Sequence, residues 1–180
     1  MSMDGDLDAP DEIVWQGNYV TARKKGRWEY VSRARGIRAA VILAIDEQDH
    51  VLLVEQYRVP LGKRCIELPA GLIGDDDGAE GEEPAAAAAR ELEEETGYRA
   101  GRMELIGEFY SSPGMVSESF TLVRAHDLVK VSEGGGTESE DITVHRVPLT
   151  GVADAIAGWR AQGFAIDVRM LMLLGPGVLA

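Results

Sequence analysis

The chain has 180 residues, 45% of them hydrophobic and 27% charged, a composition typical of a globular protein of one domain. No apolar run reaches the roughly 20 residues that a membrane-spanning helix needs, and the acidic N-terminus is unlike a signal peptide. A single cysteine, Cys65, excludes an intrachain disulfide, so we expect a cytoplasmic protein. The net charge of −13 disfavours a nucleic-acid groove, which needs a basic face.

The charges are segregated along the chain. Residues 23–38 hold seven basic side chains and one acidic one, whereas residues 75–95 hold ten acidic side chains and one basic one. A phosphorylated small molecule bound through a metal ion would satisfy both blocks. The alternative is that each block is a solvated surface run.

The predicted elements begin with residues 1–11, an Asp-rich lead-in that we expect to be disordered. Two strand-like runs, 13–22 and 28–32, follow and make residues 12–37 an N-terminal β-hairpin extension of the domain at residues 38–180. The first two strands of that domain should form a central hairpin. We expect its strands at residues 39–45, 50–57, 65–68, 103–110, 119–124 and 142–147.

Three helices are predicted. The first covers residues 83–96, with Pro84 in its first turn and Gly97 as its stop, and the others cover residues 152–162 and 166–174. Residues 71–81 and 133–136 are glycine-rich and should be loops. Mixed strands around one acidic helix indicate an α/β layered domain.

The first predicted helix holds the candidate metal ligands. At 100° per residue, Glu91, Glu94 and Glu95 fall within one 100° arc, while Glu93 lies on the far side. Carboxylates on one face repel each other, and a hard divalent cation with oxygen ligands is a reason to keep them together. The alternative is a solvated helix with an Arg90–Glu94 salt bridge.

Residues 82–98 resemble the core of the Nudix hydrolase box. The matching residues are Glu82, Arg90, Glu91, Leu92, Glu94, Glu95 and Gly97. The first glycine of the box has its counterpart in Gly71, which leaves ten residues before Glu82 and implies a five-residue insertion. The resemblance implies an α/β/α sandwich with a mixed β-sheet and the N-terminal β-hairpin extension.

The resemblance also implies roles at specific positions. Glu91 and Glu95 would ligate Mg²⁺ or Mn²⁺, assisted by Glu94 and by the backbone carbonyl of Ala70. Arg90 would hold the catalytic loop by pairing with carboxylates. Hard cations that bridge phosphate oxygens and activate water fit this set of ligands.

Within that family the chain resembles ADP-ribose pyrophosphatases and related nucleoside-diphosphate-sugar hydrolases. Pro113 stands where that subfamily carries a proline, Arg58 resembles a phosphate contact and Glu118 resembles a contact to the terminal ribose. The alternatives are an ordinary turn at Pro113 and a surface charge at Arg58.

Trp28 and Tyr19 resemble two positions that sandwich adenine in related hydrolases, where the hairpin crosses to the partner subunit. This implies a homodimer with composite sites. Aromatic rings stack on any base, so the pair supports a nucleotide more than adenine itself. The alternative is that both rings cover the core, the role we assign to Trp15 and Trp159.

The acidic loop 132–141 resembles a mobile loop of ADP-ribose pyrophosphatases. On that match Glu138 is the candidate general base, Glu140 is a further metal ligand, and the glycines 134–136 form a flexible hinge. A disordered acidic loop is the alternative. The three histidines share no ligand spacing and Cys65 shows no sign of a nucleophile site, so we expect structural roles for them.

These features predict a metal-dependent hydrolase that cuts ADP-ribose or a related ADP-sugar into AMP and a sugar phosphate. Water attacks phosphorus, so no covalent intermediate is needed. Two alternatives stay open: a hydrolase of GDP-mannose or another nucleoside-diphosphate sugar, and a non-catalytic Nudix domain that senses nucleotides. We expect no nucleic-acid or membrane partner.

Overall fold

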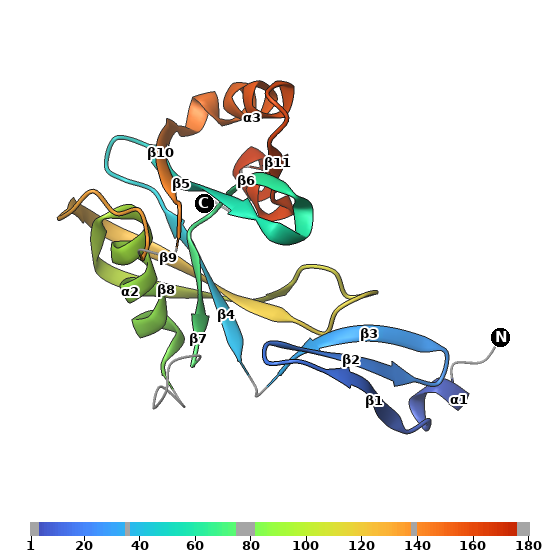
Figure 1. Cartoon of the computed structure of the whole chain (residues 1–180). Helices are drawn as coiled ribbons and strands as arrows, with labels where there is room; N and C mark the ends of the chain where they lie inside the picture. Colours follow the sequence, from blue (N-terminus) through green and yellow to red (C-terminus); the bar gives the residue numbers. More distant parts are fainter. Residues whose placement is uncertain (1–3, 35–36, 75–81, 138–139, 176–180) are drawn as a thin grey trace.

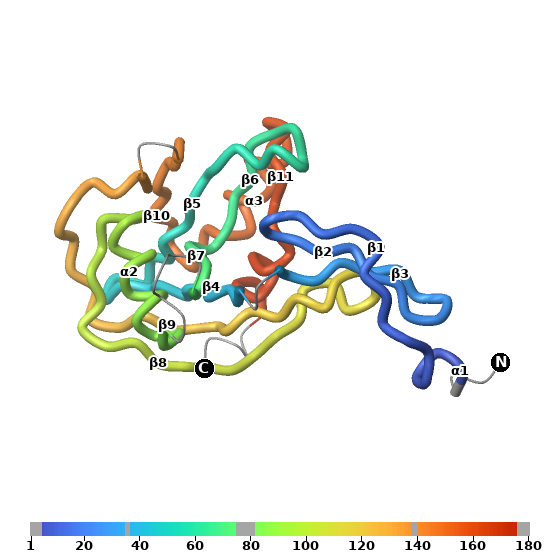
Figure 2. Tube along the Cα trace, turned by 60° about the horizontal axis from the view of Figure 1, so that its bottom comes forward, coloured from blue at the N-terminus to red at the C-terminus, as the bar shows by residue number. Residues whose placement is uncertain are grey.

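The computed structural model describes residues 4–34, 37–74, 82–137 and 140–175 (Figure 1). A short helix, α1, precedes an antiparallel sheet of three strands that stands apart at one end of the molecule (Figure 2). The bounds are α1 (Asp4–Leu7), β1 (Asp11–Gln16), β2 (Val20–Lys25) and β3 (Trp28–Arg33).

The main body contains two four-stranded sheets. The first has the order β7-β4-β9-β8, with β4 and β9 parallel. The second has the order β10-β5-β6-β11, with β11 and β6 parallel. The bounds are β4 (Arg38–Ala44), β5 (His50–Arg58), β6 (Lys63–Glu67), β7 (Ala70–Ile73), β8 (Tyr98–Tyr110), β9 (Ser119–Lys130), β10 (Thr143–Pro148) and β11 (Ala165–Ile166).

Two longer helices and three 3₁₀ segments complete the fold. Helix α2 packs on the sheet that contains β4, whereas α3 lies beside the sheet that contains β5 (Figure 1). The bounds are η1 (Val59–Leu61), α2 (Pro84–Thr96), η2 (Leu149–Gly151), α3 (Val152–Ala161) and η3 (Val168–Leu174). No helix of the described residues has the length and hydrophobicity that crossing a bilayer requires.

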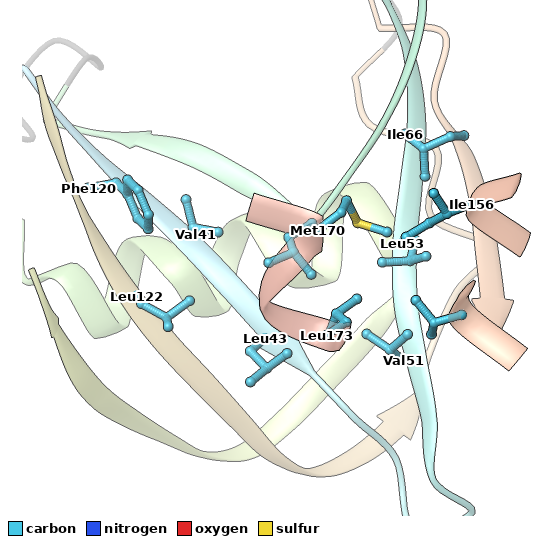
Figure 3. Close-up of a cluster of buried hydrophobic side chains, with 12 residues drawn as sticks. Val41, Leu43, Val51, Leu53, Ile66, Phe120, Leu122, Ile156, Met170 and Leu173 are labelled. Atoms are coloured by element: carbon cyan, nitrogen blue, oxygen red, sulfur yellow. The ribbon is translucent and has the colours of Figure 1, made fainter. Parts of the chain in front are cut away.

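The alternation of β4 divides the interior into two cores. Val41 and Leu43 face a cluster between the two sheets, which Met170 and Leu173 of η3 also enter (Figure 3). The intervening residues of β4 face α2, where Leu92 is fully buried. Successive side chains of a strand point to opposite faces, so an almost continuous apolar strand serves both layers.

The N-terminal sheet docks on the segment between β8 and β9. The Val31 N–H donates to the Met115 carbonyl over 3.0 Å, and the Ser117 N–H donates to the Val31 carbonyl over 2.9 Å. Arg33 adds an ion pair with Glu118 at 2.6 Å. These contacts place the end of β3 beside the main body.

The structure confirms some of the sequence-based expectations and corrects others. The mixed α/β architecture and the acidic helix are confirmed. The expected central hairpin is wrong, because β7 and β9 occupy both edges of β4 and leave β5 to the other sheet. The run 13–22 is two strands, since a turn closed by the Gly17 N–H and the Val20 carbonyl divides it.

Four further expectations differ from the structure. Residues 71–73, expected to lie in a loop, belong to strand β7. Residues 166–174 form no α-helix: strand β11 pairs with β6, and the chain then continues as the 3₁₀ segment η3. This tertiary pairing overrides the helical propensity of the segment. Within the expected disordered lead-in, residues 4–7 form α1. Trp15, expected to pack in the core, is 58% exposed.

Candidate active site

A cavity of about 570 Å³ opens where the two main sheets meet the N-terminal sheet. Its lining comes from strands β3, β4, β5, β6, β7 and β9, from α2, η1 and η3, and from the segments before β9 and β10. The charged residues of the lining are Arg33, Arg58, Glu67, Glu91, Glu95, Glu118, Glu140, Asp167 and Arg169. The cavity thus combines a carboxylate cluster with three guanidinium groups.

Helix α2 presents Glu91 and Glu95 to this cavity. Pro84 begins the helix, and Gly97 ends it with a left-handed φ of 75°. Leu92 anchors α2 in the core, and residues 91 and 95, one turn apart, share the side that faces the cavity. Glu95 is only 4% exposed, and its Oε2 accepts a hydrogen bond of 3.0 Å from the Ala70 N–H.

Burial makes these two carboxylates hard to ionise together. Burial, reinforced by the charges of Glu91 and Glu140, raises the pKa of Glu95 to about 8. Burial also raises the pKa of Glu91 to about 7, despite its ion pair with Arg90. Carboxylates of this kind gain most from a bound cation.

Gly71 makes room for the Glu91 side chain. A Cβ at Gly71 would stand 2.0 Å from Cγ and Cδ of Glu91 and 2.3 Å from its Oε1. Such distances are impossible for real atoms, so the Glu91 side chain can hold this position only because residue 71 has no side chain. The match between Gly71 and the first glycine of the Nudix box therefore has a steric reason.

Arg90 pairs with carboxylates, as expected. Its Nη1 donates to Oε1 of Glu91 over 2.8 Å, and its Nη2 lies 3.6 Å from Oε2 of Glu82. Arg90 is absent from the cavity lining, whereas its partner Glu91 belongs to it. The expected insertion falls mainly on residues 75–81, outside the described residues.

The glycines 134–136 form a docked turn. All three have positive φ, from 69° to 109°, which favours glycine. The Gly135 N–H donates to the Glu95 carbonyl over 2.8 Å, and the Gly136 N–H donates to the Glu94 carbonyl over 3.0 Å. A Cβ at Gly134 would meet the backbone of Thr96 at 2.4 Å. The expected flexible hinge is thus fastened to the end of α2.

The remaining residues of the acidic loop are placed as follows. Glu138 lies outside the described residues, so its expected position as the base stays a prediction. Glu140 lines the cavity, and its Oε2 accepts bonds from N and Oγ1 of Thr137 over 3.0 and 3.1 Å. Arg64 holds the end of the loop by donating from Nη1 to Asp141 over 2.7 Å.

The expected substrate-contact residues separate into two groups. Arg58 and Glu118 line the main cavity. Trp28 and Pro113 line a second cavity of about 350 Å³, between the tip of the β2–β3 hairpin and the segment 113–117. Trp28 is 43% exposed, so its ring is open to a ligand.

Tyr19 lies far from Trp28 within one chain. Tyr19 precedes β2 and Trp28 follows it, so the six residues of β2 separate them. At about 3.3 Å per residue, this separation is too large for two rings to enclose one base. The expected sandwich therefore requires that the two rings come from different copies of the chain.

Comparisons with known proteins identify the family of this chain. The sequence profile of the NUDIX domain family matches residues 35–164. The chain belongs to the Nudix hydrolase family. Its matched region contains the carboxylate helix, Gly71 and Arg58, and the N-terminal sheet and η3 lie outside the match.

Several Nudix relatives resemble this chain. An uncharacterized Nudix hydrolase of Schizosaccharomyces pombe is 34% identical, covering 88% of this chain and 80% of its own. A GDP-mannose pyrophosphatase of Cronobacter sakazakii is 37% identical over 78% of this chain and 72% of that one. An ADP-ribose pyrophosphatase of Bacillus subtilis is 39% identical over 53% of this chain and 49% of that one.

One further sequence relative and one solved structure are also similar to this chain. A methanol dehydrogenase activator of Bacillus methanolicus is 40% identical over 62% of this chain and 57% of that relative, so the match spans little more than half of its length. A crystal structure of an ADP compounds hydrolase superposes with a TM-score of 0.68 at 26% identity, covering 92% of this chain and 89% of that one.

Nudix hydrolases generally need a divalent cation, and the donors of this chain fit one. As they stand, no three acidic or histidine side chains of the described ranges are close enough to surround an ion. Glu91 and Glu95 nevertheless line one cavity with Glu140, whose charge helps to raise the pKa of both. A cation would bind these carboxylates beside their present partners, namely Arg90, the Ala70 N–H and Thr137.

Sequence reasoning missed four charged residues of this Nudix site: Arg33, Glu67, Asp167 and Arg169. Glu67 interrupts the apolar run Cys65-Ile66-Glu67-Leu68, and Arg169 interrupts the apolar η3. A charge inside an apolar run signals a buried ion pair, because an unpaired buried charge is too costly. The sequence contained that signal, but it did not show which residues pair with Glu67 and Arg169.

Proposed function

We propose that this Nudix hydrolase cleaves the diphosphate linkage of ADP-ribose or a related ADP-sugar, giving AMP and a sugar phosphate. One observation carries the proposal: Glu91, Glu95 and Arg58 line a single cavity. Carboxylates for a cation and a guanidinium for phosphate are what diphosphate chemistry requires. The ADP-ribose pyrophosphatase relative and the ADP compounds hydrolase structure support this substrate class.

The cation in this proposal is Mg²⁺ or Mn²⁺. Glu91, Glu95 and Glu140 would hold it, with the carbonyl of Ala70 as a further ligand and Glu94 assisting through water. When bound, such a cation neutralises charge on the phosphate oxygens and makes a bound water easier to deprotonate. The raised pKa values of Glu91 and Glu95 support a cation at this position.

The protein's own groups do the remaining work. Arg58 would bind a phosphate oxygen, and Arg90 would orient Glu91 through their 2.8 Å hydrogen bond. Glu118 would contact the terminal ribose from the position where Arg33 holds it. Glu138 would take a proton from the attacking water, and its proximity to Glu140 in the sequence supports this assignment.

The nucleotide end of the substrate would occupy the second cavity. Trp28 would stack on the base beside Pro113, and Tyr19 of a second copy would cover the other face. We therefore propose a homodimer. The exposed apolar side chains of β1, Ile13, Val14 and Trp15, support a second copy against the N-terminal sheet. The cytoplasmic location that the lone cysteine suggests is part of the same proposal.

GDP-mannose is a second candidate substrate. The GDP-mannose pyrophosphatase of Cronobacter sakazakii covers 78% of this chain, more than the ADP-ribose pyrophosphatase does. Stacking on Trp28 would accept either purine. A non-catalytic sensor is disfavoured, because a sensor has no need to keep buried carboxylates facing the cavity.

A panel of substrates tests the proposal. ADP-ribose, ADP-glucose, GDP-mannose and UDP-glucose are incubated with the full chain and Mg²⁺, and the products are separated by anion-exchange chromatography. We expect ADP-ribose to be cleaved fastest, with AMP as a product and no reaction in EDTA. Faster cleavage of GDP-mannose would select the second candidate, and no cleavage of any of the four would contradict the proposed activity.

A further inference from the structure

Arg169 reaches the cavity from a segment beyond the NUDIX match. Strand β11 pairs with β6 in parallel register, Ala165 with Cys65 and Ile166 with Ile66. The Asp167 N–H then donates to the Ile66 carbonyl over 3.0 Å. This pairing fixes where η3 begins and brings Arg169 into the lining of the cavity.

One buried carboxylate joins Arg169 to Arg58. Glu67 is 3% exposed. It accepts from Nε and Nη2 of Arg58 over 2.6 and 3.0 Å, and its Oε2 also accepts from Nη2 of Arg169 over 3.4 Å. Because both Nη2 atoms bind the same oxygen, the two guanidinium groups lie side by side.

Two further contacts fix the orientation of Arg169. Asp167 accepts from its Nε and Nη2, both over 2.7 Å, in a two-point carboxylate fork. The guanidinium also lies 5.6 Å from the ring centroid of Phe120, within the range of a cation–π contact. Glu67 of β6, Phe120 of β9 and the neighbouring Asp167 thus hold this one side chain.

This arrangement leaves donors free on both arginines. Each guanidinium uses Nε and Nη2 for carboxylates, and within the described residues no acceptor is recorded for either Nη1. Both side chains line the cavity that also holds Glu91 and Glu95. Neighbouring free guanidinium donors are suited to the oxygens of a phosphate group.

Stability alone does not account for the network. Burying ion pairs costs desolvation free energy, and apolar side chains of similar size often serve a core equally well. The contact between Asp167 and Arg169 spans only two positions of the chain and therefore joins no distant elements. Binding of an anion gives the network a purpose that packing does not.

We propose that Arg169 binds the anionic diphosphate of the substrate together with Arg58, and that Glu67 and Asp167 position the two guanidinium groups. The proposal deepens the function proposed above and rests on it for the identity of the substrate. It adds a phosphate contact outside the part of the chain that the family profile matches.

The test is binding of inorganic pyrophosphate to the full chain in EDTA, measured by isothermal titration calorimetry at low salt. Three variants are compared with the unmodified chain: Arg169→Gln, Arg169→Lys and Asp167→Asn. Arg146→Gln is the matched control, because Arg146 likewise donates from Nε to a carboxylate, that of Asp46 at 2.6 Å, but does not line the cavity.

We expect Arg169→Gln to weaken pyrophosphate binding at least tenfold and Arg146→Gln to leave it unchanged. Arg169→Lys keeps the charge but loses the fork, so its loss should be smaller than that of Arg169→Gln. Asp167→Asn keeps Arg169 but holds its guanidinium less firmly. Its loss of pyrophosphate affinity should therefore also be smaller than that of Arg169→Gln. Thermal melts serve as the control that each variant is folded. Steady-state rates on a cleaved substrate should show a raised KM for Arg169→Gln.

Two results would overturn the proposal: binding by folded Arg169→Lys and Arg169→Gln within twofold of the unmodified chain, or no pyrophosphate binding by the unmodified chain. Failure of the proposed activity is a different outcome. If the chain binds pyrophosphate through Arg169 but cleaves none of the diphosphate sugars, the anion site stands and the proposed hydrolysis fails.

Discussion

Replacing Gly71 by alanine should disturb the cation site without removing any carboxylate. The new methyl group would lie 2.0 Å from Cγ and Cδ of Glu91, whereas carbon atoms in contact are about 3.5–4.0 Å apart. The Glu91 side chain must therefore shift by about 1.5 Å. A displacement of about 1 Å at a reacting site can lower a rate a hundredfold.

The assay is the dependence of turnover on Mg²⁺ concentration for Gly71→Ala. We expect half-saturation at about 10- to 100-fold more Mg²⁺, the range for a disturbed ligand environment. Gly158→Ala is the control, because its Cβ would meet nothing within 4 Å in helix α3. An unchanged Mg²⁺ dependence in folded Gly71→Ala would refute the assignment of Glu91 as a ligand in this position.

The other predictions concern protonation, stacking and the base. Without metal, Glu95 has a folded-state pKa of about 8 against 4.5 for an ordinary glutamate, so the free energy of unfolding should fall as pH rises from 4.5 to 8. Thermal melts of Glu95→Gln should show a smaller fall over this range, and an equal fall would contradict the burial argument. Trp28→Ala should raise KM about 5- to 150-fold, as lost stacking implies; in a composite dimer site Tyr19→Ala raises KM too, and no effect of Tyr19→Ala would exclude that site. Glu138→Gln should lower kcat by about 10²–10⁴ with metal affinity unchanged, and a loss below about threefold would remove it as the base.

The acidic helix was predictable because its determinants are local. Pro84 at the start, Gly97 at the stop and the spacing of Glu91 and Glu95 all act within one helix. The Nudix match of the family profile confirms what this spacing indicated. The match of Gly71 to the first glycine of the Nudix box also agrees with the structure, in which β7 lies close to the Glu91 side chain.

The pairing of strands was less predictable, because it depends on residues distant in sequence. The apolar pattern of β4 is equally compatible with a hairpin to β5 and with a central strand between β7 and β9. The short strand β11 exists only through its pairing with β6, and residues 166–174 alone favour a helix. Local periodicity cannot choose between such alternatives.

The residues of the cavity were likewise predictable only where their determinants are local. Arg58 was predicted, but its tie to Arg169 spans more than a hundred residues and depends on the buried Glu67. The glycines 134–136 were predicted as a hinge. The sequence alone cannot decide this, because a glycine run is compatible with either a mobile segment or a turn with positive φ. The carbonyl groups of α2 that hold them decide for the turn.

The most direct test of the central claim is binding of Mn²⁺, measured by electron paramagnetic resonance without substrate. We expect Glu95→Gln to weaken Mn²⁺ binding at least tenfold. Glu93→Gln should bind as the unmodified chain does, because Glu93 faces away and pairs with the exposed Arg99. Equal Mn²⁺ affinity in all three proteins would contradict the assignment of the buried face of α2 as the cation site.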